Sequence, residues 1–308
     1  MIEINDVSKT YAKGSVKAVD NISVEIRNGE IFGFLGPNGA GKTTLINTII
    51  GYLEPELGNV SIDGEDITIE NTQLRKKIGY VPQEIALYLE LTAYQNLKIF
   101  GSIFDLKGNE LEKKINEVME LVQLTDRKKD KVKDFSGGMK RRINLAVSLL
   151  HNPDIILCDE PTVGVDPQSR NAIFEMLHDL NKKGKTILYT THYMEEAERL
   201  CSRLAIIDNG KIIAQGTLVD LINMLEQKET IKIQKTAFTQ DKISAISDMG
   251  IISEHDFYYE LIVNDKYKQH SKTFIRLEDE GIHNEFVQVS RATLEDVFLN
   301  LTGRSLRD

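Results

Sequence analysis

Cysteine, long apolar runs and an excess of positive charge are all scarce or missing in this sequence of 308 residues. Its two cysteines, Cys158 and Cys201, cannot form a disulfide framework or a zinc site by themselves. No apolar run approaches the roughly 18 to 20 residues that a membrane span needs, and residues 1–6 lack the basic-then-apolar start of a signal peptide. We therefore expect a cytoplasmic protein. The net charge of -9 disfavours general nucleic-acid binding but leaves room for a local basic patch.

Residues 36–43 fit the phosphate-binding pattern G-x-x-x-x-G-K-[ST] at every fixed position. An apolar run before this loop predicts a buried strand, and the residues after it predict a helix. Glycines allow backbone N–H groups to face phosphate oxygens at the positive end of the helix dipole. Lys42 adds a charge for the β and γ phosphates, and the Thr43 hydroxyl is placed to bind Mg²⁺. The predicted nucleotide-binding residues of this loop are Gly36, Pro37, Asn38, Gly39, Ala40, Gly41, Lys42, Thr43 and Thr44.

Two acidic residues, Asp159 and Glu160, follow the apolar run at residues 155–158. That run predicts a buried strand, and open α/β sheets place their ligands at the carboxyl ends of such strands. Because Mg²⁺ takes only one or two protein carboxylates, Asp159 fits the metal-binding role. Glu160 then fits the role of a general base or of a residue that positions water. We interpret Cys158 as a small buried apolar residue rather than a reactive thiol.

The string Ser136, Gly137 and Gly138 begins another predicted helix and forms a second candidate anion site. A helix that starts in this way offers a hydroxyl and bare N–H groups at a positive dipole end. Serine and glycine also cap helices routinely, so the string by itself is weak evidence. Its position between the phosphate loop and the acidic pair strengthens the functional interpretation.

Hydrophobic periodicity divides the chain into a nucleotide-binding domain and a smaller C-terminal domain. Alternating residues near the N-terminus predict antiparallel strands, the spacing from Thr92 to about 150 is helical, and βαβ units that imply a parallel sheet follow. We predict an α/β P-loop fold over residues 1–225, with a mixed parallel sheet, an antiparallel β subdomain and a helical insertion at about residues 84–150. A linker near residues 226–229 leads into a small α+β domain at residues 226–308.

These motifs, in this order, resemble those of the ATP-binding cassette (ABC) ATPases, which energise membrane transporters. The family signature Leu-Ser-Gly-Gly-Gln is similar to Phe-Ser-Gly-Gly-Met at residues 135–139. The other matching elements are the aromatic Tyr11, the phosphate loop, Gln83, the pair Asp159 and Glu160, Asp166, and His192. The resemblance covers roughly residues 1–220, and an ordered set of motifs is far more specific than any single one.

The resemblance implies a role for each matching residue. Tyr11 would stack on adenine, although an ordinary strand aromatic has the same appearance in sequence. Gln83 would sense Mg²⁺ and the attacking water while it links the catalytic core to the helical insertion. His192 would contact the γ-phosphate and help to hold Glu160 and its water in line. Asp166 would lie at a dimer interface, or it could equally be a helix N-cap before a proline.

The predicted site therefore has three sets of residues. The catalytic set is Glu160, His192 and Lys42. The Mg²⁺-binding set is Thr43, Gln83 and Asp159. The ATP-binding set consists of Tyr11, the nine loop residues from Gly36 to Thr44, Gln83, Ser136, Gly137 and Gly138.

The resemblance also implies partners. Two such domains would pair head to tail, so that Ser136 and Gly138 of one cover the γ-phosphate bound by the other. ATP would then hold the interface together, and hydrolysis would loosen it. Since the chain has one cassette and no membrane segment, it would need a second cassette, either another copy or a different subunit, and a separately encoded permease. The implied location is peripheral, on the inner face of the cell membrane.

Two departures from the family pattern indicate a subgroup. Met139 replaces the usual glutamine of the signature and Phe135 its leucine, and neither residue would supply a phosphate contact. The ending at residues 289–304 is similar to the tail of the daunorubicin-resistance type of cassette ATPase, in which a signature methionine followed by basic residues is common. Such proteins work with permeases of the ABC-2 type and often export antibiotics, lipids or polysaccharides. The same tail also fits an amphipathic helix that packs on its own domain.

The basic residues between 127 and 142 raise a rival hypothesis, a soluble cassette ATPase that acts on nucleic acid or ribosomes. Relatives that act in translation usually carry two cassettes in one chain, whereas this chain has one. Relatives that act in repair interrupt their cassette with a coiled coil or zinc modules, and the sequence has no long heptad array or cysteine cluster. A solvated face beside the signature is the preferred interpretation, and we expect no nucleic-acid partner.

Overall fold

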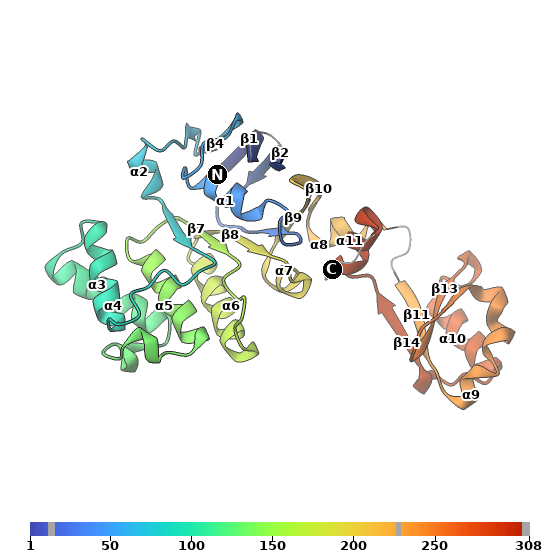
Figure 1. Cartoon of the computed structure of the whole chain (residues 1–308). Helices are drawn as coiled ribbons and strands as arrows, with labels where there is room; N and C mark the ends of the chain where they lie inside the picture. Colours follow the sequence, from blue (N-terminus) through green and yellow to red (C-terminus); the bar gives the residue numbers. More distant parts are fainter. Residues whose placement is uncertain (12–15, 226–228, 304–308) are drawn as a thin grey trace. The chain divides into compact units, whose positions relative to one another are not determined.

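The computed structural model describes residues 1–11, 16–225 and 229–303 (Figure 1). This part of the chain divides into two compact units, the first ending at Leu218 and the second beginning at Val219. The sequence places the boundary at 225/226, whereas the observed division falls after the first residue of helix α8 (Leu218–Ile222). Residues 226–228 of the predicted linker, and residue 304 of the tail, lie outside the described residues.

A six-stranded sheet with the order β10-β9-β3-β8-β7-β6 forms the centre of the first unit. Every neighbouring pair is parallel except β9 with β10, which confirms the predicted mixed parallel sheet. Strands β3, β7 and β8 are buried at every position because other elements cover both faces of the sheet. The strands are β3 (Ile31–Leu35), β6 (Ile78–Val81), β7 (Ile155–Asp159), β8 (Thr186–Thr191), β9 (Arg203–Asp208) and β10 (Lys211–Gly216).

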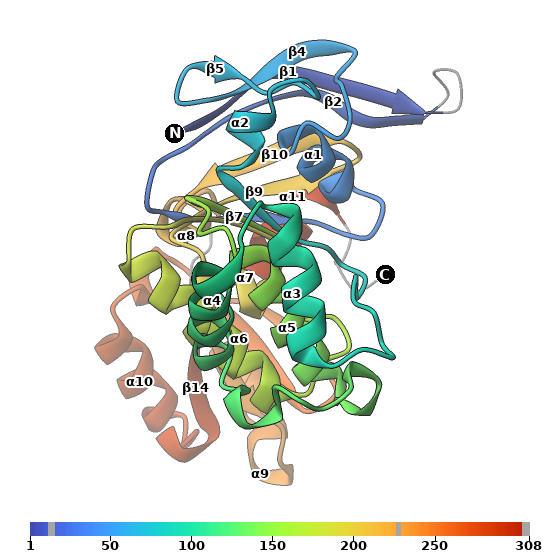
Figure 2. The ribbon, with the colours of Figure 1, turned by 90° about the vertical axis from the view of Figure 1, so that its left-hand side faces the viewer.

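The predicted antiparallel β subdomain is a separate four-stranded sheet with the order β2-β1-β4-β5. Its buried side chains share one hydrophobic cluster with helix α1 and with alternate residues of the central sheet, so α1 lies between the two sheets (Figures 1 and 2). The phosphate loop joins β3 to α1. The elements here are β1 (Ile2–Tyr11), β2 (Val16–Ile26), α1 (Lys42–Ile49), β4 (Leu57–Ile62), β5 (Glu65–Asp66) and α2 (Thr72–Arg75).

Three helices and two short 3₁₀ helices make up the helical insertion, where the helices run side by side (Figure 2). A capping box, in which Thr92 and Gln95 bond each other's backbone N–H groups, begins the first of them. The second buries the stripe predicted from its period, including Leu111, Ile115 and Val118. The elements are α3 (Ala93–Ile103), α4 (Gly108–Leu121), α5 (Gly137–Leu149), and the 3₁₀ helices Thr125–Arg127 and Val132–Asp134.

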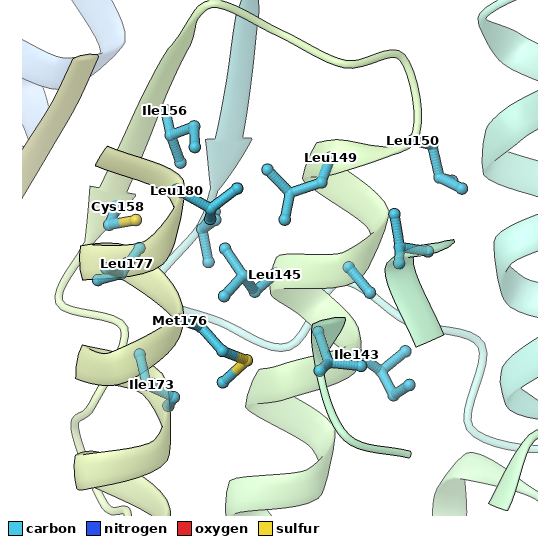
Figure 3. Packing of buried hydrophobic residues seen from close by; sticks show 14 of the residues in the cluster. Ile143, Leu145, Leu149, Leu150, Ile156, Cys158, Ile173, Met176, Leu177 and Leu180 are labelled. Carbon is cyan, nitrogen blue, oxygen red and sulfur yellow. The ribbon is translucent and has the colours of Figure 1, made fainter. Parts of the chain in front are cut away.

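Helices α5 and α6 (Pro167–Lys182) pack against each other beside strand β7 (Figure 3). Leu145 and Leu149 of α5 point toward Met176 and Leu180 of α6, and all four belong to one buried cluster. Cys158 of β7 joins the same cluster and is fully buried, and burial raises the pKa of its thiol. Its placement agrees with the apolar role predicted for it. This core holds the helix that follows the signature against the strand that ends in Asp159.

The second unit has an antiparallel sheet with the order β12-β13-β11-β14. Ile231 and Ile233 of β11 share a buried cluster with Leu277 of α10, which gives the predicted α+β domain its own core. The last helix buries Leu294, Val297 and Phe298. The elements are β11 (Glu229–Gln234), α9 (Ala237–Gln240), β12 (Gly250–Glu254), β13 (Tyr258–Val263), α10 (His270–Asp279), β14 (Val287–Arg291), α11 (Leu294–Thr302), and the 3₁₀ helices Ile243–Met249, Asp265–Tyr267 and Asn284–Phe286.

Leu177→Ala tests the packing of the α5–α6 layer. Leu177 is fully buried, so its truncation leaves a cavity, and we expect the free energy of unfolding to fall by about 2–5 kcal/mol. Urea unfolding followed by circular dichroism measures the change. The matched control is Leu89→Ala, because Leu89 is 45% exposed and its truncation should change stability by less than about 0.5 kcal/mol. Equal transitions for the two variants would show that this layer does not stabilise the first unit.

Candidate functional site

The phosphate loop is pressed closely against the backbone of neighbouring segments. A Cβ atom at Gly36 would lie 2.2 Å from the carbonyl oxygen of Ile207. Gly41 has a φ of +104°, and a Cβ atom there would lie 2.0 Å from the carbonyl oxygen of Ala18. Glycine is therefore required at both positions for steric reasons. Helix α1 begins immediately after Gly41, where its first N–H groups have no acceptor within the helix.

A cavity of about 480 Å³ opens over this loop, a size typical of small-molecule sites. It brings together side chains from the phosphate loop, from the end of β1, and from the segments after β6, β7 and β8. Tyr11 is 42% exposed at its rim, as stacking on a base would require. The lining residues are Tyr11, Ala18, Asn38, Gly39, Gly41, Lys42, Thr43, Thr44, Gln83, Glu160, Val163 and His192.

Three predicted site residues converge on the Glu160 carboxylate. The Lys42 ammonium lies 3.0 Å from Glu160 Oε1. Gln83 Nε2 donates to Glu160 Oε2 at 3.2 Å, and His192 Nδ1 lies 3.1 Å from the same oxygen. Glu160 also has a φ of 43°, in the left-handed region that non-glycine residues rarely adopt. Strain of this kind costs about 1–3 kcal/mol and persists where the surrounding contacts impose it, as they often do at functional sites.

Asp159 directly precedes Glu160 in the chain and is fully buried. Its Oδ1 accepts a hydrogen bond from Thr190 Oγ1 at 2.7 Å, whereas Oδ2 has no partner among the described residues. Burial raises the pKa of Asp159, and the hydroxyls of Thr190 and Thr43 oppose that rise. A buried carboxylate oxygen without a partner, with a threonine hydroxyl near it, fits a hard cation such as Mg²⁺.

Thr190 is a residue of the site that the sequence reasoning overlooked. Its hydroxyl accepts a hydrogen bond from the Glu160 backbone N–H at 3.0 Å while it donates to Asp159. One side chain at the end of β8 thus fixes both acidic residues at the end of β7. The sequence feature that indicates Thr190 is its position two residues before His192, at the carboxyl end of the strand next to β7.

The signature residues begin helix α5, as predicted, but they do not line the cavity. Ser136 is the N-cap, and its hydroxyl accepts a hydrogen bond from the Met139 N–H at 3.2 Å. Gly138 is buried, and a Cβ atom there would lie 2.1 Å from Ser169 Oγ. Phe135 is buried in the hydrophobic core, which agrees with the expectation that it touches no phosphate.

Asp166 is the N-cap of helix α6, the second of the two roles considered for it. Its Oδ1 accepts a hydrogen bond from the Ser169 N–H at 2.9 Å, and Pro167 follows as the first helical residue. Capping uses one carboxylate oxygen of Asp166, so the other oxygen can still contact a second cassette at a dimer interface.

Arg141 connects the signature helix to two other segments around the site. Its guanidinium donates hydrogen bonds to the backbone carbonyl of Gln83 and, at 3.3 Å, to that of Val163. Burial lowers the pKa of Arg141, and the two carbonyls satisfy its donors. In the sequence this arginine is one of a basic cluster, and nothing there separates it from its solvated neighbours.

Comparison with known proteins adds independent evidence. The ABC transporter family profile matches residues 19–163. The chain is 42% identical over 313 residues to the linearmycin resistance ATP-binding protein LnrL of Bacillus subtilis, with 100% of both chains covered. It is 36% identical over 315 residues to the Nod factor export ATP-binding protein I of Cupriavidus metallidurans, with 100% of this chain and 99% of the relative covered.

Solved structures of ATP-binding cassettes match the first unit's fold. A dimeric cassette in a post-hydrolysis state, bound to ADP and Pi, matches 71% of this chain and 99% of its own length, with 31% identity and a TM-score of 0.65. Within the described ranges, none of the helices has the length and apolar character needed to cross a membrane. The chain therefore belongs to the ABC transporter family and is an ATP-binding, ATP-hydrolysing subunit of the exporter type.

Proposed function

We propose that this subunit drives export through a separately encoded membrane permease and that its cargo is an antibiotic or a lipid-like molecule. The observation that carries the ATPase half of the proposal is the convergence of Lys42, Gln83 and His192 on Glu160. The relatives named for linearmycin resistance and for Nod factor export support the transport half. Because its proposed partner, the permease, lies in the membrane, we place this subunit on the inner face of the cell membrane as a peripheral protein.

In the proposed reaction, Glu160 is the general base for the water that attacks the γ-phosphate of ATP. Gln83 and His192 hold Glu160 Oε2 from two sides, which restricts where its lone pairs point. Lys42 binds the phosphates as a point charge. Thr43, Gln83 and Asp159 would hold Mg²⁺, which when bound neutralises charge on the phosphate oxygens.

A dimer of cassettes, with itself or with a second subunit, completes the proposed site. Ser136, Gly137 and Gly138 begin a helix of 13 residues yet lie outside the cavity of their own chain. Ser136 and Gly137 are exposed at the start of this helix, so they can face the nucleotide of another cassette, and a solved cassette dimer bound to ADP and Pi supports the pairing of two cassettes. ATP bound between two cassettes would favour the closed pair through contacts that hydrolysis removes.

The helical insertion offers an apolar surface for the proposed permease. Tyr88 and Ile103 are 54% and 67% exposed, and the Tyr88 ring lies 6.1 Å from that of Phe100, one turn before Ile103. The segment before Tyr88 is tied to the site because Asn144 donates to the carbonyls of Pro82 and Glu84, on either side of Gln83. A displacement of this surface would therefore also displace Gln83.

Ile103→Glu tests this surface, because a carboxylate there would have to be desolvated against an apolar partner. We expect stimulation of ATP hydrolysis by the co-expressed permease to fall at least about tenfold, with the basal rate of the purified subunit unchanged. Reconstituted vesicles and a phosphate-release assay measure both rates. Asn109→Glu adds the same charge to an exposed position of α4 and serves as the control. Full stimulation of Ile103→Glu would place the permease elsewhere.

The same assay separates export from the rival function on nucleic acid. Several members of the basic cluster are paired with acids: Arg127 with Asp130 at 2.5 Å, and Lys133 with Glu90 at 2.9 Å. These pairs reduce the positive charge available to a phosphate backbone. We expect ATP hydrolysis to rise with the permease and not with RNA or DNA. Stimulation by nucleic acid alone would overturn the proposed function.

A further inference from the structure

Glu196 of helix α7 (Met194–Leu200) is a buried carboxylate outside the proposed catalytic set, with 2% of its surface exposed. Its Oε1 accepts a hydrogen bond from Thr162 Oγ1 at 2.8 Å and lies 3.3 Å from Arg170 Nε. Its Oε2 accepts hydrogen bonds from Tyr189 OH at 2.9 Å and from Thr191 Oγ1 at 2.8 Å. Both oxygens are therefore satisfied, as a buried carboxylate requires.

The donors to Glu196 come from the two segments that carry the proposed catalytic groups. Thr162 lies two residues after Glu160, on the segment that leaves β7. Thr191 directly precedes His192 at the end of β8. The Glu196 carboxylate thus connects the segment that carries Glu160 with the segment that carries His192. The side chains of these two residues lie 3.1 Å apart, from His192 Nδ1 to Glu160 Oε2.

Thr191 and Arg170 extend these contacts around His192. The Thr191 hydroxyl, while donating to Glu196, accepts a hydrogen bond from the Tyr193 N–H at 2.9 Å, so the backbone is held on both sides of His192. The Arg170 guanidinium lies 5.5 Å from the centre of the Tyr193 ring. Arg170 belongs to helix α6, whose N-cap is Asp166, and it brings the start of that helix into contact with the same segment.

We propose that Glu196 is a positioning residue that holds Glu160 and His192 in register for ATP hydrolysis. This inference rests on the proposed roles of those two residues. A displacement of about 1 Å at a catalytic group can slow a reaction about 100-fold, so a residue that sets their spacing affects turnover without touching ATP. The phosphate loop keeps its own contacts, and ATP affinity does not depend on Glu196.

Glu196→Gln tests the proposal because it preserves the shape of the side chain. The hydroxyls of Thr162, Tyr189 and Thr191 donate to Glu196, and the Arg170 guanidinium lies beside it, so an amide NH₂ in place of either oxygen would face a donor. We expect kcat to fall about 10- to 100-fold, with the Kd for ATP unchanged. Glu195→Gln makes the same change at the neighbouring exposed position of α7 and should hydrolyse ATP at the wild-type rate.

Thr191 supplies a second pair of variants with a milder effect on folding. Thr191→Val removes the hydroxyl but keeps the volume, whereas Thr191→Ser keeps the hydroxyl. We expect Thr191→Val to lower kcat and Thr191→Ser to retain it. If Thr191 had a purely structural role, the melting temperature and the fraction of protein that binds ATP would fall together with kcat. The two variants would then not differ in kcat while matching in stability and ATP binding.

The measurements are kcat from phosphate release, Kd from a fluorescent ATP analogue, and the melting temperature, all on the purified full chain. If Glu160→Gln is inactive but Glu196→Gln and Thr191→Val keep the wild-type kcat, the inference about Glu196 is wrong and the proposed function stands. A parallel loss of kcat and ATP affinity, or equal rates for Thr191→Val and Thr191→Ser, would also overturn the inference about Glu196. An active Glu160→Gln variant would overturn the general-base role proposed for Glu160, and this inference with it.

Discussion

Glu160→Gln is expected to slow ATP hydrolysis by about 10²- to 10⁴-fold, the usual contribution of a general base. The amide cannot accept a proton from water at neutral pH, but it keeps the size and shape of the carboxylate. It can also still bond Gln83 and His192 after rotation of its terminal group. The change therefore removes the proton acceptor and the charge that pairs with Lys42, while it keeps the shape of the side chain.

ATP binding should survive this substitution, and we expect it to become tighter. Glu160 Oε1 lies 3.0 Å from Lys42 Nζ and competes with phosphate oxygens for that ammonium. Removing the negative charge also removes its repulsion from the phosphates. Because the γ-phosphate is no longer cleaved, the proposed nucleotide-bound dimer should accumulate.

Three measurements check this result: phosphate release, ATP affinity, and the mass of the protein in solution with ATP by light scattering. Glu175→Gln on the exposed surface of α6 makes the same chemical change and should behave as wild type. Hydrolysis at a near wild-type rate would show that Glu160 is not the base. A variant that binds ATP and stays monomeric would instead show that the proposed dimer needs a second, different cassette subunit.

The fold could be predicted from the sequence because its signals are local. The apolar runs of β3 and β7 are buried at every position, and the stripe of α4 faces the core as its period indicates. The phosphate loop could also be located, since its glycine spacing has a steric cause in the close backbones around Gly36 and Gly41. The division between the two compact units falls after Leu218, whereas the sequence signal for a linker, the polar stretch near residues 226–229, lies several residues further along the chain.

The contacts within the site were less predictable, because they depend on which strands are neighbours. The spacing of Asp159 and Glu160 indicates a cluster of charge, but not that Thr190 on the adjacent strand bonds both residues. In the sequence Arg141 belongs to a basic cluster, whereas in the structure its guanidinium donates to two backbone carbonyls. A one-dimensional pattern records the charge of such a side chain and not its partner.

Lys42→Ala is expected to weaken ATP binding about 10- to 100-fold, since a hydrogen bond to a charged group contributes about 1.5–3 kcal/mol. Lys42 also holds the phosphate loop in shape: Nζ donates to the carbonyl of Gly36 at 2.8 Å and to that of Pro37 at 3.0 Å. Its loss therefore removes a charge for the phosphates and two hydrogen bonds that close the loop. Hydrolysis should fall below detection in the phosphate-release assay.

Stability should change as well, because Lys42 and Glu160 form a buried ion pair with 4% and 6% of their side chains exposed. Removing one member of such a pair costs about 3–5 kcal/mol, since the other charge stays buried without its counter-ion. Contacts with Gln83 and His192 offset part of that cost for Glu160. We therefore expect a lower melting temperature for Lys42→Ala, and ATP binding has to be measured well below it.

The double variant Lys42→Met with Glu160→Gln separates the effect on stability from the effect on binding. Methionine keeps the length of the lysine stem, and the pair loses both charges together, so most of the lost stability should return. ATP affinity should stay low, because no ammonium faces the phosphates. Calorimetry and titration with a fluorescent ATP analogue measure the two quantities. Retained ATP affinity in Lys42→Ala, or in the double variant, would remove the phosphate-binding role assigned to Lys42.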